Sequence, residues 1–397
     1  MLQLPITKVW VDETEVEAVR RVLESGWLVQ GPRVREFEEV VAGFVGVRHA
    51  VAVNSCTSAQ FIMSRVAGLG PGDEVIVPAF TWISTANAVG FVGATPVLCD
   101  IDLATFNTDL ADARARISER TRAFYPVHLF GLAANMPAIM QVAEAKNLLV
   151  VEDCACALGA RIEGRHTGAD GLGGCFSFHP RKSITTGEGG MITTNDDRVA
   201  ALARSLRDHG AAKTDFERHT NPNSFLLTEY PNLGYNMRLT DIQGALGVVQ
   251  MGRTQTILTL KQALASEFTE QLRRIPWLRA PMTPAGYTHG YQAYCTLFKA
   301  EEALRAVAAR DERAINSLSE ERNAIMRALE ERGISTRQGT HAVHIQRHYR
   351  ETYGFRSMDY PAAYAADRLT VALPFYPQMR PDEVDHLFQS LAAVSLS

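Results

Sequence analysis

The sequence predicts an α/β protein with a large domain, built on a mostly parallel sheet between helices, and a smaller α+β carboxyl-terminal domain. In the first part of the chain, short apolar segments typical of strands alternate with segments typical of helices. From about Thr240 a long helical stretch replaces this alternation. With 397 residues, 46% of them hydrophobic, the chain is long enough for two cores. We therefore expect domains at residues 1–250 and 251–397.

The expected elements of the large domain follow one another in the βαβ order. Helical segments at 13–25 and 32–45 come first, and then strands at 50–54, 74–78 and 95–99 with helices between them. The remaining elements are a strand, a helix, two apolar strands and a return strand that closes as a hairpin, at 123–127, 136–146, 148–153, 175–178 and 190–195. Such an order predicts one mostly parallel sheet covered by helices.

The carboxyl-terminal region begins with the long helical stretch at 241–273, which we expect to bridge the two domains. A strand at 291–298, a helix at about 320–332 and a final helix after Pro381 follow. The charged, helix-prone segment at 301–313 is interpreted as a surface insertion.

Composition and charge exclude several classes of protein. The net charge is -4, with 40 Lys and Arg against 44 Asp and Glu, so no nucleic-acid partner is expected. No apolar run has the length of a membrane span, and the first residues lack the pattern of a signal peptide. A cytoplasmic protein is expected, and its six scattered cysteines are expected to be reduced thiols.

Lys182 is the most informative residue, within F-S-F-H-P-R-K-S-I-T-T-G-E-G-G at 176–190. The segment is typical of a strand end followed by a glycine-rich loop, where a buried ammonium group would be costly. A Schiff base with pyridoxal phosphate (PLP) would remove that cost. An isolated lysine in such a loop is more often simply solvated.

The other demands of PLP have candidates along the chain. Asp153, at the carboxyl end of an apolar strand, suits the pyridine nitrogen, although an isolated aspartate there is more often a helix cap. Trp82 follows another strand and could cover the ring, or belong to the core. The candidates for the phosphate are the hydroxyl residues before a helix and after a strand, which could also be ordinary caps: Thr57, Ser58 and Ser177.

The sequence resembles the DegT/DnrJ/EryC1/StrS aminotransferases over nearly its whole length. The markers are S-G-W-L-V-Q-G-P, F-E, G-P-G-D-E-V-I-V-P-A-F-T-W, P-V-H-L-F-G, E-D and G-Y-N-M-R-L-T-D-I-Q-G-A. The resemblance implies the fold of type I PLP transferases, with a mostly parallel seven-stranded sheet. It assigns Lys182 as the catalytic lysine, Asp153 to the pyridine nitrogen, Trp82 to stacking, and Asn236 to the phosphate across a homodimer interface. Thr57, Ser58 and Ser177 would surround that phosphate.

Two positions depart from the family pattern. Where the family has a glutamine beside the phenolic oxygen of PLP, this chain has Cys156, and Leu158 stands in place of a common histidine. Because a thiol is a weak donor, the contact at Cys156 is expected to be weakened or relayed by water. The C-A-C run at 154–156 lacks a second pair at ligand spacing, so no metal is expected.

The resemblance implies transfer of an amino group from L-glutamate to a keto sugar, such as a nucleotide-linked 4-keto-6-deoxy or 3-keto hexose, for polysaccharide or antibiotic biosynthesis. A keto-cyclitol aminotransferase, a PLP-dependent sugar dehydratase and a non-catalytic sensor or scaffold are the alternatives. The family's dehydratases known to us replace the lysine with histidine, whereas Lys182 is present here. The substrate candidates are four residues that could instead be structural: His128, Arg337, His341 and His344.

Overall fold

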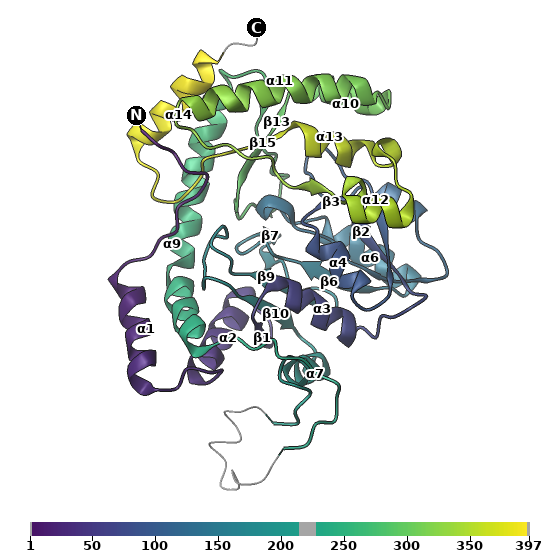
Figure 1. The fold of residues 1–397 in the computed structure, drawn as a ribbon, viewed down its shortest axis with the longest axis vertical. Coiled ribbons are helices and arrows are strands. Elements are labelled where there is room, and N and C mark those ends of the chain that lie inside the picture. The colour runs from purple at the N-terminus through teal and green to yellow at the C-terminus, as the bar shows by residue number, and fades with distance from the viewer. Residues whose placement is uncertain (1, 214–227, 395–397) are drawn as a thin grey trace.

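The structure, a computed structural model, describes residues 2–213 and 228–394. Its centre is a seven-stranded sheet in the order β1-β10-β9-β6-β5-β2-β4 (Figure 1). Only β10 runs antiparallel to its neighbours, β1 and β9, so the expected mostly parallel sheet with one return strand is confirmed. The strands are β1 (His49–Val53), β2 (Glu74–Pro78), β4 (Thr95–Cys99), β5 (Thr121–Phe124), β6 (Leu149–Asp153), β9 (Gly173–Ser177) and β10 (Gly190–Thr194).

Helices cover both faces of this sheet. Successive residues of a strand point to opposite faces, and in β1 Val51 and Val53 belong to one core cluster whereas Ala50 and Ala52 belong to another. The first face is packed by α3 (Cys56–Val66), α4 (Ser84–Gly90) and α7 (Asp197–Arg207). The second face is packed by α2 (Pro32–Val45), α5 (Leu110–Ala115), α6 (Met136–Lys146) and the first half of α9 (Asp241–Leu272).

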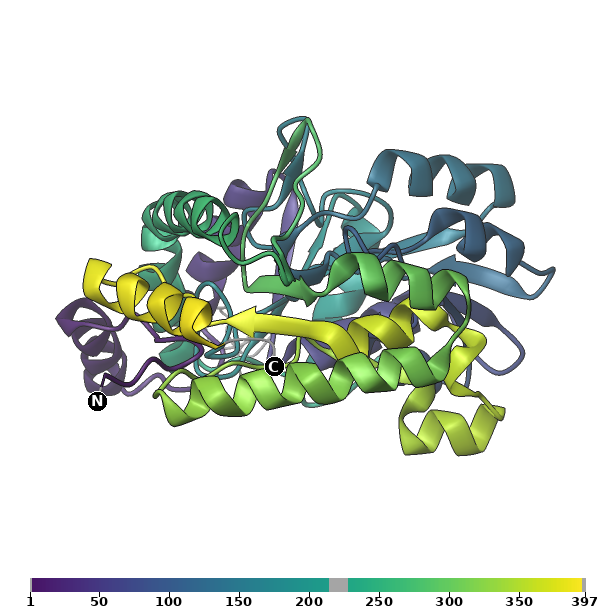
Figure 2. The same cartoon turned by 90° about the horizontal axis from the view of Figure 1, so that it is seen from above.

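The carboxyl-terminal part forms a second unit around a three-stranded antiparallel sheet, in the order β11-β13-β15. Figure 2 shows α11 running along β15, and the Arg322 guanidinium of α11 donates to the Thr370 carbonyl at 3.0 Å. The expected domain boundary at residue 250 falls inside α9 and remains a prediction. The elements of this unit are β11 (Leu278–Arg279), β13 (Tyr294–Phe298), α10 (Ala300–Ala308), α11 (Glu312–Glu331), α12 (Arg347–Tyr353), α13 (Pro361–Leu369), β15 (Thr370–Leu373) and α14 (Pro381–Ala393).

Shorter elements connect the two units. The β14 strand (His341–Ala342) pairs with β3 (Phe80–Thr81), and β12 (Tyr287–Thr288) joins β7 (Arg161–Ile162), which pairs with β8 (Arg165–His166). The amino-terminal segment before α1 (Glu13–Ser25) also reaches the second unit. There the Leu4 N–H donates to the Gly333 carbonyl at 2.8 Å. The units are therefore joined by backbone pairing as well as by α9.

One expectation about the second unit is wrong. The segment at 301–313 is not a surface insertion, because it forms most of α10 and the start of α11. Ala303 and Ala306 of α10 are buried in the same core as β13 and α13. The charged residues form only the outer face of an amphipathic helix. In the described ranges, no helix combines the length and apolar character that crossing a membrane requires.

Candidate active site

Lys182 lies in the loop that leaves β9 and returns as β10. Its backbone N–H donates to the His179 carbonyl at 2.8 Å, which fixes a turn. Its Nζ lies 3.2 Å from the Cys156 Sγ. These two residues line a small cavity together with Ser177, at the end of β9, and Gln292. The structure therefore brings together the lysine, the thiol and a hydroxyl group that the sequence placed in the site.

The charge state of Lys182 depends on its neighbours. Burial lowers the pKa of the amine, but electrostatic interaction and a hydrogen bond with the Cys156 Sγ raise it, with smaller contributions from Cys56 and Asp153. The pKa of Lys182 is raised overall. Without an electrophile to react with, the amine therefore remains protonated.

Asp153 is held at the carboxyl end of β6 by three hydrogen bonds. The Gln60 side-chain amide and the Thr85 hydroxyl each donate to its Oδ2 at 2.6 Å, and the Ala155 N–H donates to its Oδ1 at 3.0 Å. Gln60 comes from α3 and Thr85 from α4, and neither was predicted from the sequence. The carboxylate is only 4% exposed. These donors to both oxygens fix the carboxylate in one orientation.

The amino terminus of α3 lies beside the end of β9. The first amides of a helix have no partner within the helix and favour an anion. Ser55 caps α3 by accepting from the Ser58 N–H, and Thr57 and Ser58 are both partly exposed there. Strand pairing carries Ser177 to the same edge, because Gly190 pairs with both Ser177 and Val53. A Cβ at Gly190 would lie 2.4 Å from Ser55 backbone atoms, so only glycine permits this approach.

Trp82 lies between β3 and α4, three residues before Thr85. Its backbone carbonyl accepts from the Thr85 N–H at 3.2 Å, which ties it to the residue that also binds Asp153. The indole is 57% exposed, so it does not belong to the core. Its ring centre lies 5.7 Å from that of His341, at an angle of 42°. One side of the indole is therefore available to cover a planar ligand.

The chemistry of these residues suits PLP. Lys182 offers an amine, the fixed carboxylate of Asp153 suits a protonated pyridine nitrogen, and the start of α3 with Ser177 suits a phosphate. Cys156 lies beside the amine and would adjoin the bound cofactor. Asn236 is exposed, on a segment whose backbone pairs with the end of α7, and its role across an interface remains a prediction.

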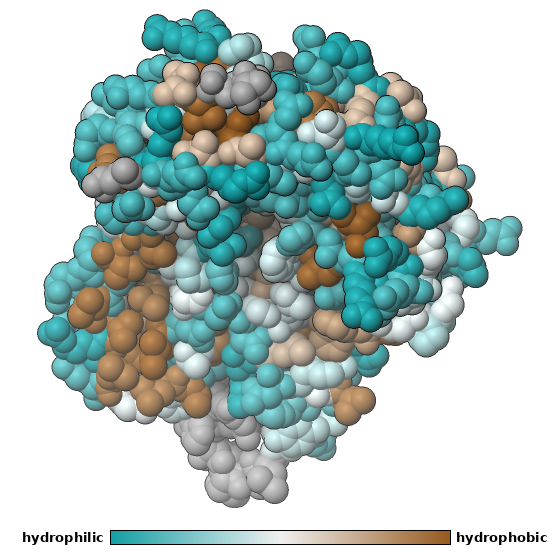
Figure 3. Space-filling model, turned by 45° about the horizontal axis from the view of Figure 1, so that its top comes forward, coloured by the Kyte–Doolittle hydropathy of each residue, from teal (hydrophilic) through white to brown (hydrophobic). Residues whose placement is uncertain are grey.

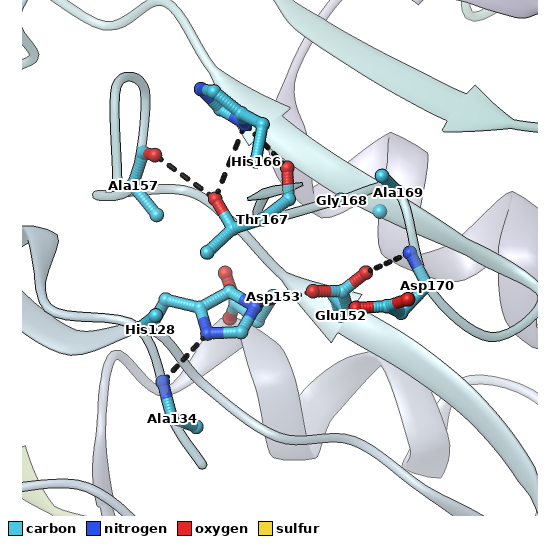
Figure 4. Close-up of polar contacts among 12 residues, drawn as sticks. His128, Ala134, Glu152, Asp153, Ala157, His166, Thr167, Gly168, Ala169 and Asp170 are labelled. Atoms are coloured by element: carbon cyan, nitrogen blue, oxygen red, sulfur yellow. Dashed lines mark hydrogen bonds and ion pairs between the residues drawn. The ribbon is translucent and has the colours of Figure 1, made fainter. Parts of the chain in front are cut away.

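Two of the four expected substrate residues are buried. His128 is fully buried; its Nδ1 accepts from the Ala134 N–H at 3.0 Å, and its Nε2 lies 2.8 Å from the Glu152 carboxylate (Figure 4). His344 is also fully buried, with its Nε2 bound to the Ser357 carbonyl at 2.9 Å, and burial lowers the pKa of this histidine to about 4. Neither imidazole can contact a substrate here, and we assign both to structural roles.

Arg337 and His341 do reach an open cavity. It has a volume of about 280 Å³, and its lining includes the apolar side chains of Trp82, Phe130, Leu373 and Phe375. Arg181, which the sequence analysis did not select, lines the same cavity. Gln292 lines both this cavity and the smaller one around Lys182, so the two cavities adjoin.

A buried cluster near Asp153 contains possible metal ligands. Atoms of His128, Glu152 and Cys154 lie within 4.8 Å of one another. The Glu152 carboxylate already accepts from the Asp170 N–H at 2.8 Å, and burial raises the pKa of the Cys154 thiol well above its usual range. A protonated thiol beside a bonded histidine and carboxylate is a polar network that supports β6 (Figure 4).

Comparison with known proteins agrees with this geometry. The model of the DegT/DnrJ/EryC1/StrS aminotransferase family matches residues 10–392. The spore coat polysaccharide biosynthesis protein SpsC of Bacillus subtilis (strain 168) is 37% identical over 388 residues, 98% of this chain and 96% of that protein. The aminotransferase TlmJ from Streptoalloteichus hindustanus has a TM-score of 0.86 and 29% identity over 98% of both chains. Spr1654 from Streptococcus pneumoniae, in its PLP form, has a TM-score of 0.87 and 26% identity over 99% of this chain and 98% of that chain.

Proposed function

The chain belongs to the DegT/DnrJ/EryC1/StrS aminotransferase family of PLP-dependent sugar aminotransferases, and on that premise we propose that it moves the amino group of L-glutamate to a nucleotide-linked keto sugar. The single observation that supports this proposal most is the convergence of Lys182 and Asp153 on one end of the sheet, from different strands. A dehydratase that dispenses with the lysine, or a scaffold, would not need this pair.

Each residue has a proposed task. Bound PLP supplies an electron sink for the bond that breaks at the substrate carbon. Lys182 holds the cofactor through its amine and carries a proton between the substrate carbon and the cofactor. Asp153 keeps the pyridine nitrogen protonated, and Trp82 covers the ring. Thr57, Ser58 and Ser177 bind the phosphate at the start of α3.

The proposal for the amino acceptor rests on the similarity of this chain to SpsC. SpsC is named for polysaccharide biosynthesis, which favours a nucleotide-activated 4-keto-6-deoxy or 3-keto hexose as the acceptor. All six cysteines are free thiols, which accords with an enzyme of the reducing cytoplasm.

We further propose a homodimer whose sites are shared. A broad apolar area lies on the side of the molecule that carries α1 (Figure 3). Isolated exposed apolar residues are normal, but a cluster of them marks an interaction surface. Those exposed between residues 9 and 40 are Val9, Val11, Val16, Leu23, Leu28, Val29 and Val40. If Asn236 completes the neighbour's phosphate site, dilution to monomer releases cofactor and activity together. A cofactor-loaded, active monomer in analytical ultracentrifugation would contradict this.

The function is tested by absorbance with PLP, L-glutamate and a panel of nucleotide-linked keto sugars. We expect a visible band on PLP addition that collapses with L-glutamate and returns with the correct acceptor. Lys182→Ala should abolish the band, whereas Lys146→Ala, on the exposed surface of α6, should leave it unchanged. A band in Lys182→Ala, or no response to any amino donor in the wild type, would overturn the proposal.

A further inference from the structure

Two arginines lie in the larger cavity without a partner for their charge. No hydrogen bond or ion pair joins the guanidinium of Arg181 or Arg337 to any other residue in the ranges that the structure describes. Both side chains are exposed. Among the described residues, none that lines this cavity is an aspartate or glutamate. Two cations without a counter-ion make the cavity a site of positive potential.

Both arginines are anchored through their backbones. Arg337 exchanges two backbone hydrogen bonds with Ala372, at 3.1 and 2.7 Å, on the edge of β15. The Arg181 carbonyl accepts from the Gln292 side-chain amide at 2.8 Å, and its N–H donates to the His179 Nδ1 at 3.2 Å. The two charges therefore come from opposite units of the molecule, on fixed backbones with free ends. Less conformational freedom is then lost when an anion binds.

The cavity adjoins the reacting amine. Arg181 directly precedes Lys182, and Gln292 lines both cavities. Trp82, which we assign to the cofactor ring, forms part of the wall. An anion held by the arginines is therefore part of the molecule that reacts at Lys182, and not of a distant effector.

Size and charge narrow the choice of ligand. The volume of about 280 Å³ lies below the usual range for small-molecule pockets, which begins at about 300 Å³. Such a space suits an amino acid better than a whole nucleotide sugar. The forked guanidinium matches a carboxylate with two parallel hydrogen bonds. A dicarboxylic amino acid carries two carboxylates, and the cavity holds two arginines.

We propose that Arg181 and Arg337 form the subsite that binds the carboxylates of a dicarboxylic amino donor, and so select L-glutamate or a close analogue. This deepens the proposed function and rests on it. The apolar wall of Phe130, Leu373 and Phe375 accommodates the methylene groups between the carboxylates. The uncharged donor L-alanine gains less from such a site.

The test uses the PLP-loaded enzyme and glutarate, a dicarboxylate that lacks the reacting amine. Isothermal titration calorimetry should show glutarate binding that Arg181→Gln and Arg337→Gln each weaken by about 10- to 100-fold, the loss expected for one charged hydrogen-bond partner. The L-glutamate concentration that half-collapses the visible band should rise by a similar factor. Arg274→Gln removes the same charge from an exposed arginine beyond the end of α9 and should change neither.

The outcomes separate this inference from the proposed function. Unchanged glutarate binding in both variants would overturn the proposed subsite. The proposal would also be overturned if the variants impaired only the return of the visible band with a nucleotide sugar, because the arginines would then bind the phosphates of that sugar. A third outcome is that glutarate binding depends on both arginines but no keto sugar converts the enzyme back to the PLP form. This outcome would support the subsite and overturn the proposal that a keto sugar is the acceptor.

Discussion

Asp153 and Lys182 lie at the same end of the sheet but are held in opposite ways. Asp153 ends a buried strand and receives three hydrogen bonds from Gln60, Thr85 and Ala155. Lys182 lies in a loop, and within residues 2–213 and 228–394 its amine has a single hydrogen-bond contact, the Cys156 Sγ at 3.2 Å. A group that supplies constant charge gains from a fixed position. A group that must leave the cofactor and move protons needs freedom, and the loop provides it.

The largest effect is expected from a substitution of Asp153, the residue that is held in a fixed position. Asp153→Asn keeps the shape and can still accept from Gln60 and Thr85, but it removes the negative charge that holds the pyridine proton. We expect the rate of the first half-reaction with L-glutamate to fall by about 100- to 1,000-fold, as for other preorganised charges. Stopped-flow absorbance measures this rate. PLP should still bind, because Lys182 and the phosphate site remain, and an unchanged rate would show that Asp153 does not face the nitrogen.

The next effect concerns a second lysine, which lies near the loop of Lys182. Lys261 of α9 is buried, and no carboxylate pairs with its Nζ within the described residues. The Nζ has long contacts of 3.4 Å with the Ser183 hydroxyl and the Gln292 carbonyl, and it lies 5.8 Å from the centre of the Phe375 ring. Burial lowers the pKa of this amine from 10.5 to about 8. Because the folded pKa is the lower one, the charged lysine destabilises the folded state fully below about pH 8, and the cost fades as the pH approaches 10.5.

We therefore expect Lys261→Met to stabilise the protein at pH 7 by about 2 to 3 kcal/mol. Denaturant unfolding at pH 7 and at pH 10 should show the gain shrinking at the higher value. Lys146→Met, at an exposed position, should stay within about 0.5 kcal/mol at both. A gain that is the same at both pH values would mean that packing, and not the buried charge, is responsible.

A smaller effect is expected from a single donor to Asp153. Thr85→Val preserves shape but removes the hydroxyl that lies 2.6 Å from the Asp153 Oδ2. One hydrogen bond to a charged group contributes about 1.5 kcal/mol, so the first half-reaction should slow by about tenfold. The control Thr105→Val removes a comparable hydroxyl from the exposed carboxylate of Asp102 and should not change the rate. Equal rates in both variants would indicate that Gln60 and Ala155 suffice to fix the carboxylate.

The same contrast explains what the sequence could predict. Strand ends and glycine-rich loops are local patterns, so the central sheet, the position of Asp153 and the loop of Lys182 could all be placed before the fold was known. The contacts of Asp153 with Gln60 and Thr85 join residues 93 and 68 positions apart. They depend on which faces of α3 and α4 turn toward β6, and this is settled only by packing.

Burial was the other quantity that local patterns did not reveal. His128 and His344 stand among polar and apolar neighbours alike, yet both are fully buried and bonded. Arg181 lies beside Lys182 in the sequence, but its place near a second arginine depends on the pairing of Arg337 with Ala372 of β15, which brings Arg337 to the same cavity. In α10 the many charged residues favoured an exposed segment, although Ala303 and Ala306 are buried in the core.

The smallest effect tests the single contact of Lys182. Because the electrostatic interaction and the hydrogen bond with the Cys156 Sγ act against burial to raise the pKa of the Lys182 amine, Cys156→Ala should lower that pKa. Only the neutral amine attacks an aldehyde, so the rate of PLP attachment to the apoenzyme rises with pH as Lys182 loses its proton. In Cys156→Ala this rise should shift to lower pH, and at neutral pH the variant should bind PLP faster than the wild type. Cys156→Ser keeps a hydrogen-bonding group without a thiol and should fall between the two. A profile unmoved in both variants would mean that the thiol contributes neither charge nor hydrogen bond, and that the loop alone sets the state of the lysine.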